Sequence, residues 1–141
     1  MQYVCDAGPY TWFRIETPGE AGLESQLMDH AVERYFKQTH EQAERSYVPP
    51  ASSAAFEQSI GRKSYVQKTM PMFLTLRDNE GNALVTAMLP PGGQKDPGFR
   101  PIVVGKANAD PYPLYGEAIR ALAQHFGMPL ERDRCFPYRR G

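Results

Sequence analysis

Few residues of this chain combine a reactive type with the spacing that a reaction requires. The three histidines, His30, His40 and His125, do not recur at the i,i+3 or i,i+4 spacing that places two metal ligands on one helix face. We read His30 and His40 as solvated surface side chains and His125 as a favourable charge near a helix end. The sequence also lacks a phosphate-binding glycine loop, a Gly-x-Ser-x-Gly motif and a Cys-x-x-Cys pair. We therefore predict no catalytic residue, no metal site and no cofactor.

Glu24 is the side chain most able to act as an acid, a base or a ligand-binding group. On a helical wheel it falls in the middle of an apolar face, where a buried charge would need a partner such as Arg14. A pocket between this helix and the sheet would bring Trp12 close to both. The alternative is that Glu24 overhangs the sheet edge in water, near the helix start, where a carboxylate is favourable.

Two basic segments offer further binding groups. In residues 90–100, the glycines let the backbone approach a ligand closely, and Lys95 and Arg100 can meet an anion. The competing interpretation is a mobile surface connection. The tail at 130–141 mixes arginines with aromatic residues, which suits either nucleic-acid stacking or attachment of the tail to the domain; we favour attachment.

Composition and charge narrow the class of protein. With 141 residues, 41% hydrophobic and 23% charged, the chain is predicted to form a single globular domain over 1–141. Residues 1–46 hold eight acidic and four basic side chains, and residues 47–141 hold eight and twelve, so net charges of −4 and +4 cancel. No segment approaches the roughly 18 apolar residues of a membrane span, and the start lacks a signal-peptide pattern. We expect a soluble cytoplasmic protein without a membrane partner, in which Cys5 and Cys135 are unrelated reduced thiols.

The elements that must position these groups follow from periodicity and turn chemistry. Apolar runs at 2–5 and 10–16 predict two strands, and a capping box at Thr17 and Glu20 opens a helix predicted to continue to about residue 46. Residues 49–63 are expected to be a flexible loop with at most a short helical turn at 54–59. From residue 64 a strand, interrupted at Pro71, is predicted to pair with 83–89 through a turn at 78–82.

The last third of the chain is predicted to add one strand and one helix. The strand is expected at 101–106, after the 90–100 loop, and the helix begins after Asp110 and ends at Gly127. The fold class is then α+β: a two-layer structure with a mainly antiparallel sheet of about five strands, and one long and one shorter helix packed on one face.

Three functions remain open on this basis. The favoured one is a non-catalytic binding or interaction domain whose wide apolar helix face or sheet surface engages a protein partner or a second copy of the chain. The alternative is a small enzyme or small-molecule binder whose pocket, near Glu24, Arg14, Trp12, Lys95 and Arg100, lies between the first helix and the sheet. Nucleic-acid association through the basic second half is the weakest, because overall neutrality does not favour it.

Overall fold

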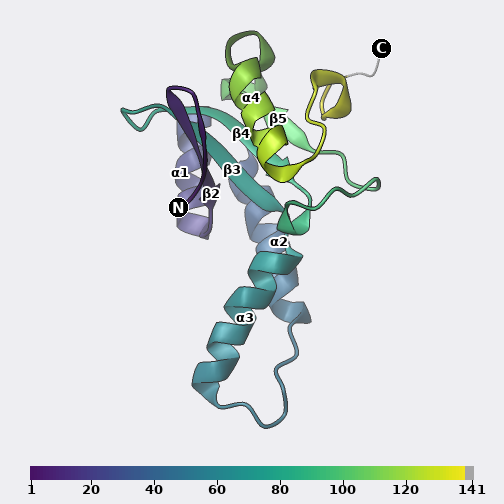
Figure 1. Cartoon of the computed structure of the whole chain (residues 1–141). Coiled ribbons are helices and arrows are strands. Elements are labelled where there is room, and N and C mark those ends of the chain that lie inside the picture. Colours follow the sequence, from purple (N-terminus) through teal and green to yellow (C-terminus); the bar gives the residue numbers. More distant parts are fainter. Residues whose placement is uncertain (139–141) are drawn as a thin grey trace.

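A five-stranded antiparallel sheet forms the centre of the protein (Figure 1). The computed structural model describes residues 1–138. The strands are β1 (Gln2–Ala7), β2 (Tyr10–Ile15), β3 (Met72–Arg77), β4 (Ala83–Leu89) and β5 (Ile102–Val104), and they pair in sequence order. The turn between β3 and β4 is held by Asp78, whose carboxylate accepts from Asn82 N and Nδ2 at 2.9 and 3.0 Å. The predicted α+β class and antiparallel sheet are confirmed.

Helices cover both faces of this sheet, so the expectation of one helical layer was wrong. The helices are α1 (Pro18–Met28), α2 (Val32–Ser46), α3 (Ala55–Thr69) and α4 (Tyr112–Phe126). α4 lies on one face, and α1 and α2 lie on the other (Figure 1). The reason is visible in β3, where Leu74 and Leu76 belong to the cluster under α4 while Phe73 belongs to the opposite cluster. Side chains alternate along a strand, and here both sets are apolar and buried.

The predicted long helix is two helices. α1 starts as expected: Thr17 Oγ1 accepts from Glu20 N at 3.2 Å, and Glu20 Oε1 accepts from Thr17 N at 3.2 Å. It stops at Met28 because Asp29 adopts the left-handed conformation, with φ 52° and ψ 56°. Glu33 N then donates to Ser25 Oγ at 2.8 Å, so α1 supplies a cap for the first turn of α2.

A third helix occupies residues expected to be loop and strand. α3 covers 55–69, and with α2 it forms a helical hairpin that projects away from the sheet (Figure 1). We call residues 44–65 the arm; each of them is at least partly exposed. The helix ends because the residue before Pro71, Met70, is forced into an extended conformation. Pro71 thus separates a helix from a strand instead of interrupting one strand.

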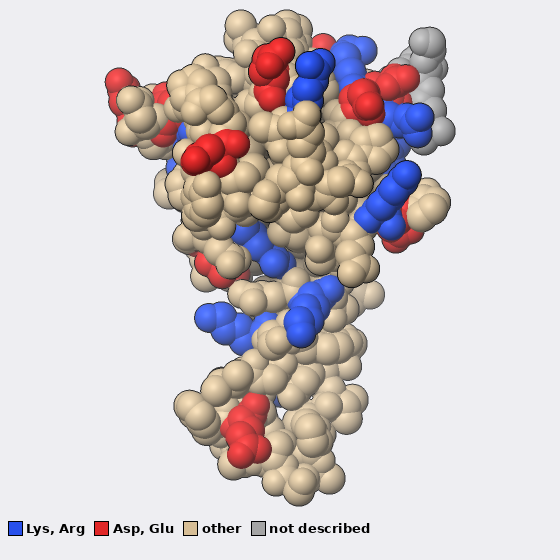
Figure 2. Space-filling view, viewed as in Figure 1, with Lys and Arg blue, Asp and Glu red and all other residues tan. Residues whose placement is uncertain are grey.

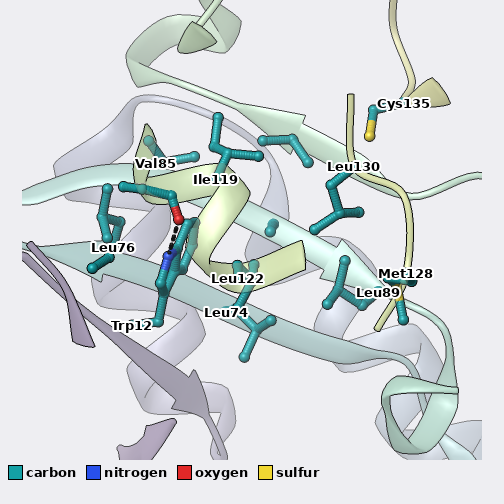
Figure 3. Close-up of a cluster of buried hydrophobic side chains, with 14 of the residues drawn as sticks. Trp12, Leu74, Leu76, Val85, Leu89, Ile119, Leu122, Met128, Leu130 and Cys135 are labelled. Atoms are coloured by element: carbon teal, nitrogen blue, oxygen red, sulfur yellow. Dashed lines mark hydrogen bonds between the residues drawn. The ribbon is translucent and has the colours of Figure 1, made fainter. Parts of the chain in front are cut away.

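The core under α4 is apolar and closed. Trp12 and Leu122 are completely buried, and Trp12 Nε1 donates to the Ala118 carbonyl at 2.9 Å (Figure 3). The helix ends at Gly127, which takes the expected left-handed conformation with φ 65°. The hydrogen bond from Trp12 to Ala118 satisfies the one polar atom that burial of the indole would leave without a partner.

The C-terminal segment up to residue 138 packs beside β5. Phe136 N donates to the Pro101 carbonyl at 2.8 Å, and Tyr138 Oη donates to the Val103 carbonyl at 3.2 Å. Arg139 and Arg140, part of the predicted tail, lie outside the described residues. Within 1–138, no helix has the length and apolar character that crossing a membrane requires.

Candidate functional site

Glu24 is completely buried between α1 and the sheet, and two side chains from the sheet bind its carboxylate. Arg77 Nη2 donates to Oε1 at 2.8 Å, and Thr86 Oγ1 donates to Oε2 at 2.6 Å. Of the two alternatives drawn from the sequence, the buried carboxylate is therefore correct and the water-exposed one is wrong, and the suggested partner was also wrong. Arg14 instead donates to the Gln67 carbonyl at 2.7 Å.

Each of the three nitrogens of the Arg77 guanidinium donates a hydrogen bond. Its Nε donates to Thr75 Oγ1 at 3.0 Å and its Nη1 donates to the Gly81 carbonyl at 3.2 Å. A register irregularity lies between Leu76 and Arg77, and Arg77 keeps the strand alternation, on the same face as Thr75. A buried ion pair is costly to desolvate, and these additional hydrogen bonds are what make it tolerable.

His30 extends this chain of polar groups to a cavity. Its Nε2 lies 2.8 Å from Thr86 Oγ1, and its Nδ1 accepts from Val32 N at 3.4 Å. Burial lowers the pKa of His30, opposed by a backbone hydrogen bond and by the charges of Glu24 and Asp29. Desolvation dominates, so the imidazole is neutral at neutral pH. The expectation that His30 is a solvated surface residue was wrong, because the break after α1 turns it toward β4.

The cavity beside His30 and Thr86 has a volume of about 350 Å³ and is mostly apolar. It lies between the α1–α2 junction and strands β4 and β5. We call it the His30 pocket, and its lining is His30, Ala31, Val32, Tyr35, Phe73, Thr86, Ala87, Met88, Ile102, Val104, Asn108, Phe136 and Pro137. Phe73, Thr86 and Val104 are buried and form its floor, whereas Ala31, Tyr35 and Asn108 are exposed at its rim.

The other residues proposed from sequence do not meet at this pocket. Trp12 is on the opposite face of the sheet, against α4 (Figure 3). Lys95 is exposed in the connection between β4 and β5. Arg100 donates to the carbonyls of Cys135 and Tyr138, so it holds the C-terminal segment. Glu24 does not line the pocket itself; it binds Arg77 and Thr86, and Thr86 in turn contacts His30.

Two other concave regions are weaker candidates for a binding site. A depression of about 790 Å³ lies along α4 and the residues that come after it, and its exposed lining includes Glu117, Arg120 and Arg132. A smaller one of about 200 Å³ lies where α2 and α3 leave the sheet. Neither contains a completely buried charged group, whereas the His30 pocket is linked to one through Thr86. Buried polar groups behind an apolar cavity are a common feature of binding sites.

Metal and nucleic-acid binding receive no direct support from the arrangement of charges. Among residues 1–138, no three His, Cys, Asp or Glu side chains are grouped so that they could hold a metal ion. On the face shown in Figure 2, acidic and basic side chains both occur over the body, with several basic ones near the base of the arm.

Thr86 and Arg77 were missed at the sequence level, although one signal was present. Thr75 and Thr86 interrupt two apolar strands and are directly opposed in the β3–β4 register. Two polar residues opposed on a face that is otherwise apolar indicate polar partners above them: Glu24 binds Thr86, and Arg77 binds Thr75. No family model, curated protein or solved structure matches this chain.

Proposed function

We propose that this protein binds a small, mainly apolar molecule in the His30 pocket. The observation that supports this is the cavity of about 350 Å³ whose apolar floor contains one hydrogen-bonded polar pair, Thr86 and His30. Its volume is at the lower end of the range for small-molecule sites, and a few placed polar groups in an apolar lining are typical of them. This proposal follows the binder alternative drawn from the sequence, but at a pocket that none of the residues expected there lines.

The surroundings of the pocket favour a site that is formed before the ligand arrives. Glu24 is held by Arg77 and Thr86, and His30 is held by Thr86 and the backbone of Val32. Each of these polar side chains has a hydrogen-bond partner, so the floor of the pocket has little freedom to rearrange. A preformed site spends less binding energy on ordering side chains.

A fluorescent apolar probe tests this proposal. N-phenyl-1-naphthylamine should bind with saturable enhancement of its fluorescence. Ala31→Trp places an indole at the exposed rim of the pocket and should weaken binding at least tenfold. The matched control is Ala55→Trp, which adds the same indole at an exposed position at the start of α3. Equal binding by all three proteins would show that the probe occupies another surface and would reject the pocket.

An interaction function is the second candidate, and one observation favours it. The wide apolar face predicted for the first helix divides into two rows. The row of Met28, Val32 and Phe36 is buried, whereas Leu23, Leu27, Ala31 and Tyr35 are all exposed, Leu23 by 51% and Tyr35 by 52%. Leu23 and Leu27 are one turn apart on α1, Ala31 precedes α2 and Tyr35 lies on α2. Exposed apolar side chains grouped on a surface are typical of a site that meets a partner.

Light scattering separates the self-associating version of this function from the others. A dimer is expected at tens of micromolar protein, and the double variant Leu23→Ser/Leu27→Ser should return it to a monomer. A wild-type protein that stays strictly monomeric as its concentration increases would reject self-association and leave the pocket proposal unaffected.

A further inference from the structure

We infer that the His30 pocket selects uncharged ligands that carry an N–H or O–H group, which donates a hydrogen bond to Thr86 Oγ1. This inference rests on the proposed function and specifies the chemical class of ligand. It follows from counting protons and lone pairs along the chain from Arg77 to His30, together with the absence of charge in the lining of the pocket.

The proton of the Thr86 hydroxyl is already used. A threonine hydroxyl has one hydrogen and two lone pairs. Oγ1 lies 2.6 Å from Glu24 Oε2, and the other oxygen of this carboxylate accepts from Arg77 Nη2 at 2.8 Å in an ion pair. Two acceptors at that separation would repel each other, so the hydroxyl donates to Glu24.

The tautomer of His30 follows from its two contacts. Val32 N can only donate, so Nδ1 must accept and the ring proton is on Nε2. Nε2–H then donates to Thr86 Oγ1, at 2.8 Å. His30 in this state has no free hydrogen-bonding atom, whereas Thr86 keeps one lone pair and no proton. The floor of the pocket therefore offers an acceptor and no donor.

Charge restricts the ligand further. Among residues 1–138, the lining of the pocket contains no Lys, Arg, Asp or Glu, and His30 is neutral. An anionic group at the floor would face a lone pair of Thr86 with the Glu24 carboxylate directly behind it. A cationic group would lose its hydration without gaining a counter-charge, because Glu24 is already neutralised by Arg77. A neutral donor avoids both costs.

The rim does not produce the same selectivity. Tyr35 and Asn108 are exposed, so their polar atoms can be satisfied by water whether or not a ligand is bound. They also carry both donors and acceptors, and would pair with either kind of ligand. Discrimination between donor and acceptor ligands is therefore assigned to Thr86 at the floor.

Three naphthalene derivatives of similar size test the inference by titration calorimetry. 1-Naphthol carries a donor, 1-methoxynaphthalene carries only an acceptor, and 1-naphthoate is an anion. We expect 1-naphthol to bind about three- to tenfold more tightly than 1-methoxynaphthalene, as one net hydrogen bond allows, and 1-naphthoate to bind most weakly. In Thr86→Val the preference for 1-naphthol should disappear, whereas Thr86→Ser and Tyr35→Phe should keep it.

The outcomes separate this inference from the proposal on which it rests. If the probes bind but 1-methoxynaphthalene or 1-naphthoate equals 1-naphthol, the pocket remains and the donor rule is rejected. If Ala31→Trp leaves the affinity of 1-naphthol unchanged, or if no probe binds, the proposed function itself fails. The comparison of ligands on the wild-type protein decides the inference even if Thr86→Val does not fold.

Discussion

The two faces of the sheet are buried in different ways. Under α4 the core is apolar, and the indole N–H of Trp12 is satisfied by the carbonyl of Ala118. Under α1 and α2 a smaller apolar cluster around Phe36 and Phe73 lies beside the buried pair of Glu24 and Arg77. Burial of apolar side chains stabilises the folded state directly. A buried ion pair makes a net contribution to stability of roughly zero, and loss of either partner leaves an unpaired buried charge. The proposed site therefore lies on the face of the sheet that contributes less to the stability of the fold.

The largest expected effect is on the apolar face. Trp12→Ala removes a completely buried indole together with its hydrogen bond to the Ala118 carbonyl. We expect a loss of about 3–5 kcal/mol in the free energy of unfolding, measured by urea denaturation. A loss below about 1 kcal/mol would show that this face does not carry the stability assigned to it.

Breaking the ion pair should have the next largest effect. Glu24→Ala leaves Arg77 buried beside a cavity without its counter-charge, and we expect a loss of about 3 kcal/mol. The double variant Glu24→Leu/Arg77→Met replaces both charges by apolar groups of similar size and should cost less than the single change. A double variant that is less stable than Glu24→Ala would indicate that the pair is a net source of stability.

The smallest effect is a dependence on pH that only the polar face should show. Because the pKa of His30 in the folded protein is lowered from its ordinary 6.5, the unfolded chain takes up this proton first as the pH falls. The contribution of His30 to stability is therefore complete above pH 6.5, decreases below it, and becomes constant below the folded pKa. Urea midpoints measured from about pH 7.5 to about pH 5 should fall less in His30→Gln, whose amide can still donate to Thr86. Parallel profiles would exclude His30 as the cause.

Much of the sheet and the fourth helix could be predicted from local chemistry. The strand of Trp12, the turn at Asp78 and the cap at Gly127 each depend on residues close in sequence. The helical wheel placed Glu24 within the apolar face but left open whether its carboxylate is buried or in water. What it binds did not follow from the sequence, because Arg77 and Thr86 lie more than fifty positions away and their approach depends on how α1 lies over the sheet.

The wrong predictions for the end of α1 and for α3 also have local causes. Asp29 ends α1 in a left-handed conformation without the glycine or proline that usually signals a helix end. Val66 and Met70 lie in the segment predicted to be a strand, since they continue the alternation of β3, yet they are also four residues apart, as on one face of a helix. Exposed residues dominate the first half of α3, so no apolar periodicity identified it.

The arm has a consequence for how the molecule fluctuates. Its residues, 44–65, are all at least partly exposed, so opening this hairpin would expose little apolar surface that is not already in water. Its amide hydrogens should therefore exchange with deuterium through local opening, at a free energy well below that of global unfolding. The amides of β3, buried along its whole length, should exchange only when the entire protein unfolds. Proteases that cut transiently opened chain should accordingly cleave first between α2 and α3, leaving both faces of the sheet intact.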